Sequence, residues 1–155
     1  MKTASIPVTL RTSNYRLSAN SDFLDALEGA GLRDAAGFAK VLRSGRELPG
    51  GRGPQRLVEL PGTGAMLRLR EARRGGVIGR FLASRYLSPI RVARELELWL
   101  VLCERGAPLP TPVAAISRRR GVLWESHFGT LDRPESLDGL AWLRASPTTS
   151  ASTSA

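Results

Sequence analysis

The segment AMLRLRE, residues 65–71, carries two arginines at alternate positions. Because successive side chains of a strand point to opposite faces, Met66, Arg68 and Arg70 would share one face and two leucines the other. A guanidinium group can bind phosphate through two parallel hydrogen bonds. The segment is therefore suited to an anionic ligand, and the alternative is that both arginines are simply solvated.

Glycines and further arginines surround this segment. The glycine-rich stretch GGRG precedes it at residues 50–53, and the pair Gly75 and Gly76 follows it. The glycine pair would let the chain leave the strand before the basic piece GRFLASRYL. The arginines on either side of the pair form a basic run: Arg73, Arg74, Arg80 and Arg85.

Two β-hairpins and one long helix are the elements that must position these residues. RLVEL and AMLRLRE flank the turn PGTG, in which proline presets one dihedral and glycine accepts a positive φ. SPIRVARELELWLVLCERG predicts a helix from Ser88, a good N-cap, to Gly106, a good C-terminal stop. VAAISRRRGVLWESHF predicts a second hairpin that turns at Arg120 and Gly121.

The remaining segments are less regular. Residues 1–20 read as extended or disordered, NSDFLDALEGAGL as a short helix capped by Asn20 or Ser21, and AAGFAKVLRSG as a helix or a strand. Residues 21–143 would form the folded unit, and residues 144–155 a low-complexity, disordered tail. We expect an α+β fold, with an antiparallel sheet of about four or five strands and the long helix packed on it.

Composition favours an anionic partner. The 155 residues suffice for one domain, and their formal net charge is +9. Only two of the 23 basic residues are lysines, so the excess is arginine, which a GC-rich genome could also supply. The single Cys103 excludes an internal disulfide and a cysteine metal cluster. The sequence contains neither a membrane-spanning run nor a signal core, so we expect a cytoplasmic chain.

Five short motifs in this order resemble the lipopolysaccharide kinase (Kdo/WaaP) family, and most of all its 3-deoxy-D-manno-octulosonic acid (Kdo) kinases: GGRG, MLRLREARRGG, RYL, RELELWL and GAPLPTPVAA. The resemblance extends over residues 23–143. It implies a protein-kinase-like N-terminal lobe, with ATP and Mg²⁺ as cofactors. The implied reaction is phosphorylation of Kdo on a lipid A precursor in lipopolysaccharide biosynthesis.

The resemblance also implies a nucleotide-binding loop. Kinases cover the ATP phosphates with a glycine-rich loop, and Gly51, Arg52 and Gly53 stand at the matching place. Arg56 occupies the position of the third glycine of the kinase pattern, so the loop departs from it. A plain hairpin turn is the alternative.

Kinases further hold the phosphates with a strand cation that is paired with a helix glutamate. The spacing from the RRGG motif favours Arg70 as this cation, whereas an apolar residue two positions earlier, to cover adenine, favours Arg68 because that residue is Met66. We favour Arg68 and keep Arg70 as the alternative. Glu95 is the implied helix partner, and Glu97 is the alternative.

The resemblance implies that the basic run lies near the anionic acceptor. A peripheral contact with the anionic cytoplasmic face of the inner membrane is a further option, because each basic residue there contributes about 1 kcal/mol. The non-functional alternative for this basic run is a solvated loop. His127, the only histidine, follows the last predicted strand and is interpreted as a hinge residue without a catalytic role.

No catalytic-loop aspartate or metal-binding pair follows Trp142, so we expect these residues to form a small lobe without its C-terminal lobe. We therefore assign no catalytic residue and no metal ligand, and expect the chain alone to be inactive as a kinase. A small basic nucleic-acid-binding protein is one alternative, disfavoured because the tryptophans lie in apolar runs rather than among arginines. A non-catalytic lobe that binds nucleotide or a partner is the other.

Overall fold

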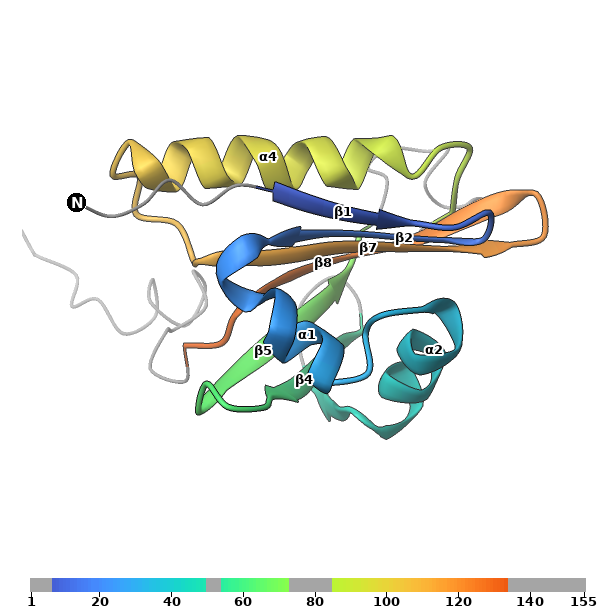
Figure 1. Cartoon of the computed structure of the whole chain (residues 1–155), viewed down its shortest axis with the longest axis horizontal. Coiled ribbons are helices and arrows are strands. Elements are labelled where there is room, and N and C mark those ends of the chain that lie inside the picture. The colour runs from blue at the N-terminus through green and yellow to red at the C-terminus, as the bar shows by residue number, and fades with distance from the viewer. Residues whose placement is uncertain (1–6, 50–53, 73–84, 134–155) are drawn as a thin grey trace, which may run out of the picture.

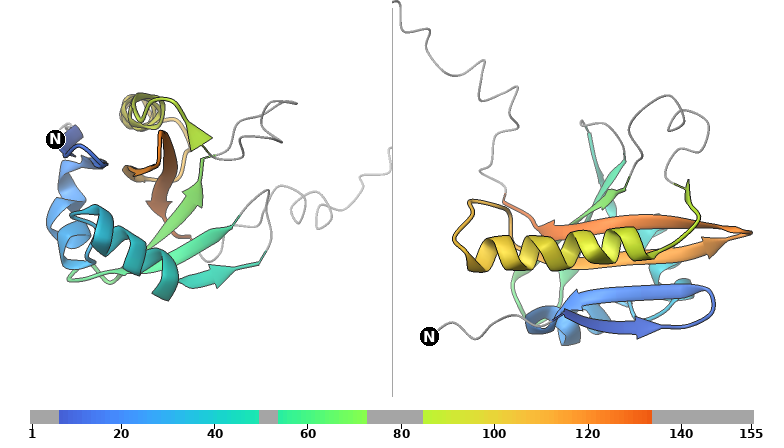
Figure 2. Two further views of the ribbon diagram at one scale, coloured as in Figure 1. Left: turned by 90° about the vertical axis from the view of Figure 1, so that its right-hand side faces the viewer. Right: turned by 90° about the horizontal axis from the view of Figure 1, so that it is seen from above.

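The computed structural model describes residues 7–49, 54–72 and 85–133. Within these ranges one antiparallel sheet forms the centre, with a long helix on one face and two short helices on the other (Figures 1 and 2). The fold is therefore α+β, as the sequence predicts. No helix of the described part is long and apolar enough to cross a membrane.

The sheet runs in the order β1-β2-β7-β8-β5-β4-β3, and β6 pairs with β8 off this path. The strands are β1 Pro7–Arg11, β2 Tyr15–Asn20, β3 Arg46–Leu48, β4 Gln55–Leu60, β5 Ala65–Glu71, β6 Arg85–Tyr86, β7 Pro112–Arg120 and β8 Leu123–Leu131. The helices are a 3₁₀ turn Ser21–Phe23, α1 Leu24–Gly29, α2 Ala35–Ser44 and α4 Ile90–Glu104.

The β4–β5 hairpin forms as the sequence predicts. Leu60 pairs with Ala65 beside the turn and Gln55 pairs with Arg70 at the far end. Gly62 and Gly64 adopt φ values of 76° and 66°, which glycine tolerates at no steric cost. The Thr63 hydroxyl donates a 2.8 Å hydrogen bond to the Leu60 carbonyl and closes the turn.

The second hairpin and the long helix also follow the prediction. β7 and β8 turn at Gly121, whose φ is 66°. The Ser88 hydroxyl accepts a 3.3 Å hydrogen bond from the Ile90 N–H, and Gly106, with φ 83°, follows the last turn of α4. The ambiguous segment after Asp34 is a helix, because the Asp34 carboxylate accepts a 2.8 Å hydrogen bond from the Gly37 N–H.

The expected number of strands was too low. Residues 7–20 form a hairpin whose second strand pairs with β7, and two short strands, β3 and β6, extend the sheet further. Tyr15, Leu17 and Ala19 are fully buried at alternate positions of β2, so burial against the helices holds this hairpin in the sheet. A strand of two or three residues is too short to show the alternation of apolar and polar residues from which strands are predicted.

Each face of the sheet has its own apolar core. Leu67 and Leu69 of β5 face α1 and α2, together with Leu27 and Phe38 of those helices. The smaller core lies beneath α4 and consists of Val92, Leu96, Leu100, Ala115 and Phe128, with Trp99 and Ala72 at its margin. The site residues of β5 belong to this second face.

Candidate functional site

Met66, Arg68 and Arg70 of β5 share the face of the sheet that α4 covers. Arg68 is opposite Thr130 of β8, and Arg70 is opposite Phe128, which packs under α4. Met66 and Arg68 are half-buried, whereas Arg70 is exposed. The alternation read from the sequence therefore holds, and it gives this face two cations beside one apolar side chain.

Arg68 is held by Asp132, the residue that follows β8. The Arg68 Nε–H donates a 2.7 Å hydrogen bond to Asp132 Oδ1, and the Asp132 N–H donates a 2.8 Å bond to the Met66 carbonyl. The Asp132 side chain is only 9% exposed and that of Arg68 is 35% exposed. A nearly buried carboxylate therefore neutralises much of the charge that Arg68 presents.

Arg70 has no such carboxylate among the described residues. Its guanidinium carbon lies 6.0 Å from the centre of the Phe128 ring, at the outer limit of a cation–π contact. Trp99 of α4 meets the same ring edge-on, with 5.0 Å between the ring centres. Arg70 therefore stands over an aromatic pair with its hydrogen-bond donors available to a ligand.

Glu95 does not form the expected pair with a strand arginine. It is half-buried on α4 and makes no ion pair with a described residue. Asp132 already holds Arg68, and Arg70 lies over Phe128 instead. The structure thus gathers Met66, Arg68 and Arg70 on one face, and Glu95 forms no ion pair with either arginine.

A cavity of about 230 Å³ lies beside Arg68, at the end of β8. Thr130 and Leu131 of that strand form one wall, and Pro108 and Pro110, which follow α4, form another. Arg133 completes the lining. Typical small-molecule pockets measure about 300–1,000 Å³, so this cavity could hold only part of a ligand such as a nucleotide.

The other predicted site residues fall outside the described part or lack a described side chain. Gly51, Arg52, Gly53, Arg73, Arg74 and Arg80 lie outside the described residues. The backbone of Arg85 pairs with Glu125 between β6 and β8. Within the described residues, no group of three or more His, Cys, Asp or Glu side chains is placed to hold a metal ion.

His127 is not a hinge residue, because β8 continues to Leu131. It is buried on the opposite face of the sheet, where its ring meets Phe38 edge-on with 5.2 Å between the ring centres. Burial lowers the pKa of His127, and the charges of Glu125 and Glu71 partly oppose this effect. The residue therefore has a packing role away from the candidate site.

Sequence reasoning missed Asp132. Its place beside Arg68 depends on the antiparallel register between β5 and β8, which joins residues 64 positions apart. The only signal was a carboxylate four residues after the predicted end of the second hairpin at Phe128, in GTLD. That signal could not be used without knowledge of which strand lies alongside.

Known proteins match only part of the chain. Over 96 residues the chain is 36% identical to the 3-deoxy-D-manno-octulosonic acid kinase of Xylella fastidiosa (strain M23). The matched region covers 59% of this chain and 37% of that protein. The enzyme of the same name from Vibrio parahaemolyticus serotype O3:K6 is 31% identical over 101 residues, or 63% of this chain and 42% of that protein.

The chain thus spans about two fifths of the length of the curated relatives it matches. No protein-family model matches it, and no solved structure does. The motifs read from the sequence and the relatives agree: this chain is similar, over about three fifths of its length, to 3-deoxy-D-manno-octulosonic acid kinases.

Proposed function

We propose that this chain forms the ATP-facing small lobe of a kinase that phosphorylates Kdo on a lipid A precursor. The partial similarity to Kdo kinases supports the reaction class. The order of elements supports the lobe: a glycine-rich stretch between β3 and β4, then a cationic strand, a long helix and two further strands. Protein kinases place their phosphate-binding parts on these elements in this order.

The observation that carries the proposal is the cationic face of β5. Arg68 and Arg70 point to the side of the sheet that α4 covers, next to Met66 and the cavity at the end of β8. A nucleotide needs an apolar surface for its base and cations for its phosphates. Met66 would contact the base, and the two arginines would bind the phosphates.

The structure changes the relative weight of the two arginines. Asp132 accepts a hydrogen bond from Arg68, whereas no described carboxylate binds Arg70. A phosphate group would have to compete with Asp132 for Arg68 but could bind Arg70 directly. We therefore assign Arg70 as the main phosphate-binding cation and Arg68 as a second, with Glu95 available to orient either one when nucleotide is bound.

ATP fits this face in part, since cations and an apolar neighbour are present, and it would supply the phosphoryl group. The described residues contain no group of three or more His, Cys, Asp or Glu side chains that could hold a metal ion, so we assign no Mg²⁺ ligand among them. No catalytic residue is assigned to this chain. The basic run remains part of the proposal, as the contact with the anionic acceptor or with the inner-membrane surface.

Calorimetry with ATP tests the assignment. The variant Arg70→Gln should bind ATP about tenfold more weakly than wild type, because a charge-assisted hydrogen bond contributes about 1.5–3 kcal/mol. Arg68→Gln should cost less, since Asp132 already neutralises part of that charge. Arg43→Gln, an exposed position on α2 across the sheet, controls for the loss of one positive charge. Equal ATP affinities for Arg70→Gln and Arg43→Gln would remove Arg70 from the phosphate role.

A further inference from the structure

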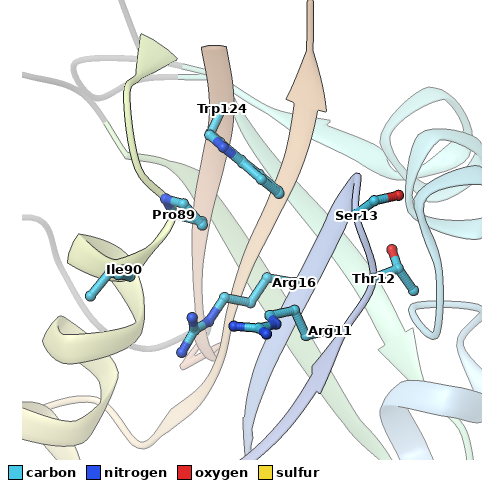
Figure 3. Close-up of a pocket in the computed structure, with 7 residues that line it drawn as sticks. All are labelled: Arg11, Thr12, Ser13, Arg16, Pro89, Ile90 and Trp124. Carbon is cyan, nitrogen blue, oxygen red and sulfur yellow. The ribbon is translucent and has the colours of Figure 1, made fainter. Parts of the chain in front are cut away.

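A second cavity, of about 560 Å³, lies at the start of α4 (Figure 3). The β1–β2 hairpin supplies Arg11 and Arg16 and the turn residues Thr12 and Ser13. Trp124 of β8 forms another wall, and the first residues of α4 complete the lining. No residue of β5 takes part, so this cavity is separate from the proposed nucleotide face.

Two arginines that form no ion pair with a described residue line this cavity. Arg11 and Arg16 are direct cross-strand partners in the hairpin, and both side chains line the pocket (Figure 3). Like charges directly opposite each other destabilise a sheet. No hydrogen bond or ion pair joins either side chain to a described residue, and the buried Nε of Arg16 has no hydrogen-bond partner.

The described residues of the lining include no acidic group that would balance these charges. A buried, unpaired guanidinium N–H costs stability unless a ligand satisfies it. Two convergent guanidinium groups can supply parallel donors to the oxygens of one phosphate. The ring of Trp124, half-buried on the same side, adds an apolar surface that a bare inorganic ion would not need.

The size of the cavity agrees with an organic ligand. Its volume of about 560 Å³ lies within the range of about 300–1,000 Å³ that small-molecule pockets occupy. We propose that this pocket binds a phosphate monoester, with the phosphate between Arg11 and Arg16 and the organic group against Trp124. The monoester can belong to a soluble metabolite or to a lipid headgroup, since both present the same dianionic phosphate.

Phenyl phosphate is a suitable soluble probe, because it joins a phosphate monoester to an aromatic body. At about 0.15 M salt, where long-range attraction is screened, wild type should bind it with a defined stoichiometry by calorimetry. Arg16→Gln and Arg11→Gln should each weaken binding about tenfold or more. Arg43→Gln, which has the same net charge as these two variants, should bind phenyl phosphate like wild type.

Two additions keep the test decisive. Arg11 is exposed, so Arg11→Gln should fold even where the half-buried Arg16→Gln does not, and thermal unfolding checks both. Vesicles of phosphatidylcholine with and without phosphatidic acid distinguish the lipid source from the soluble one. Binding only to phosphatidic acid vesicles, lost in Arg11→Gln, would assign the pocket to a lipid phosphate.

The proposal is overturned if neither phenyl phosphate nor phosphatidic acid vesicles bind. Equal weakening by Arg43→Gln and Arg11→Gln would overturn it as well, because it would show attraction to net charge alone. The outcome is independent of the nucleotide proposal. Loss of ATP binding in Arg70→Gln concerns the β5 face, and loss of phenyl phosphate in Arg11→Gln concerns this pocket.

Discussion

The single histidine makes the stability of the sheet depend on pH in a predictable direction. His127 is 6% exposed, its ring contacts Phe38, and its Nδ1 has no hydrogen-bond partner. Burial lowers its pKa below the ordinary 6.5; Glu125 and Glu71 partly counteract this, whereas Arg118 adds to it. The folded protein therefore disfavours a proton that the unfolded chain readily accepts.

The direction in which the free energy of unfolding changes with pH follows from proton linkage. Above about pH 6.5 both states hold a neutral imidazole, and the full stability is present. As the pH falls below that value, only the unfolded chain binds the proton, so the free energy of unfolding decreases until the lower folded-state pKa is reached. One pH unit corresponds to at most about 1.4 kcal/mol for one group. Between about pH 7.5 and about pH 5.5 the loss from His127 is therefore limited to at most about 1.4 kcal/mol.

The assay compares wild type with His127→Phe, which keeps an aromatic ring against Phe38 and removes the titration. Free energies of unfolding from urea titrations should fall more steeply with decreasing pH in wild type than in the variant. The difference in slope isolates His127 from the carboxylates that both proteins share. Parallel pH profiles, or an imidazole resonance that titrates at its ordinary pKa, would refute this reasoning.

Two further predictions concern packing and the Arg68–Asp132 contact. A Cβ at Gly37 would collide with the carbonyl oxygen of Gly31, so Gly37→Ala should destabilise the fold by about 1–3 kcal/mol. Gly29→Ala meets only Pro61 at 3.6 Å and should be neutral or stabilising by about 0.5 kcal/mol; thermal unfolding of the pair decides. Asp132→Asn should cost about 1 kcal/mol of stability, because Arg68 is partly exposed, yet should tighten ATP binding by freeing Arg68. Weaker ATP binding in Asp132→Asn would contradict the competition with phosphate for Arg68 that we assign to this carboxylate.

Local signals were sufficient for the hairpins and the long helix. The PGTG turn and the alternation of AMLRLRE predict both the β4–β5 pairing and the shared face of Arg68 and Arg70. Ser88 and Gly106 delimit α4 to within two residues. These features depend on short-range chemistry, which a single sequence carries.

Features that depend on the assembled sheet could not be predicted from the sequence. The alternation of Tyr15, Leu17 and Ala19 is visible in the sequence, but nothing local indicates that β2 pairs with β7 across 95 or more positions. The Arg68–Asp132 bond and the Arg11–Arg16 pocket depend likewise on strand register and on which elements adjoin. Contacts between site residues on neighbouring strands could therefore be found only in the structure. The shared face of residues on one strand could be predicted from the sequence.

The most direct test of the nucleotide face uses Met66, one of only two methionines in the sequence. In protein labelled with ¹³C at the methionine methyl groups, the Met66 signal reports on the apolar neighbour of Arg68 and Arg70. We predict that ATP shifts this signal in wild type and in Arg43→Gln, and that Arg70→Gln requires about tenfold more ATP for the same shift. A Met66 signal that stays in place while ATP binds elsewhere would contradict the assignment of this face to the nucleotide.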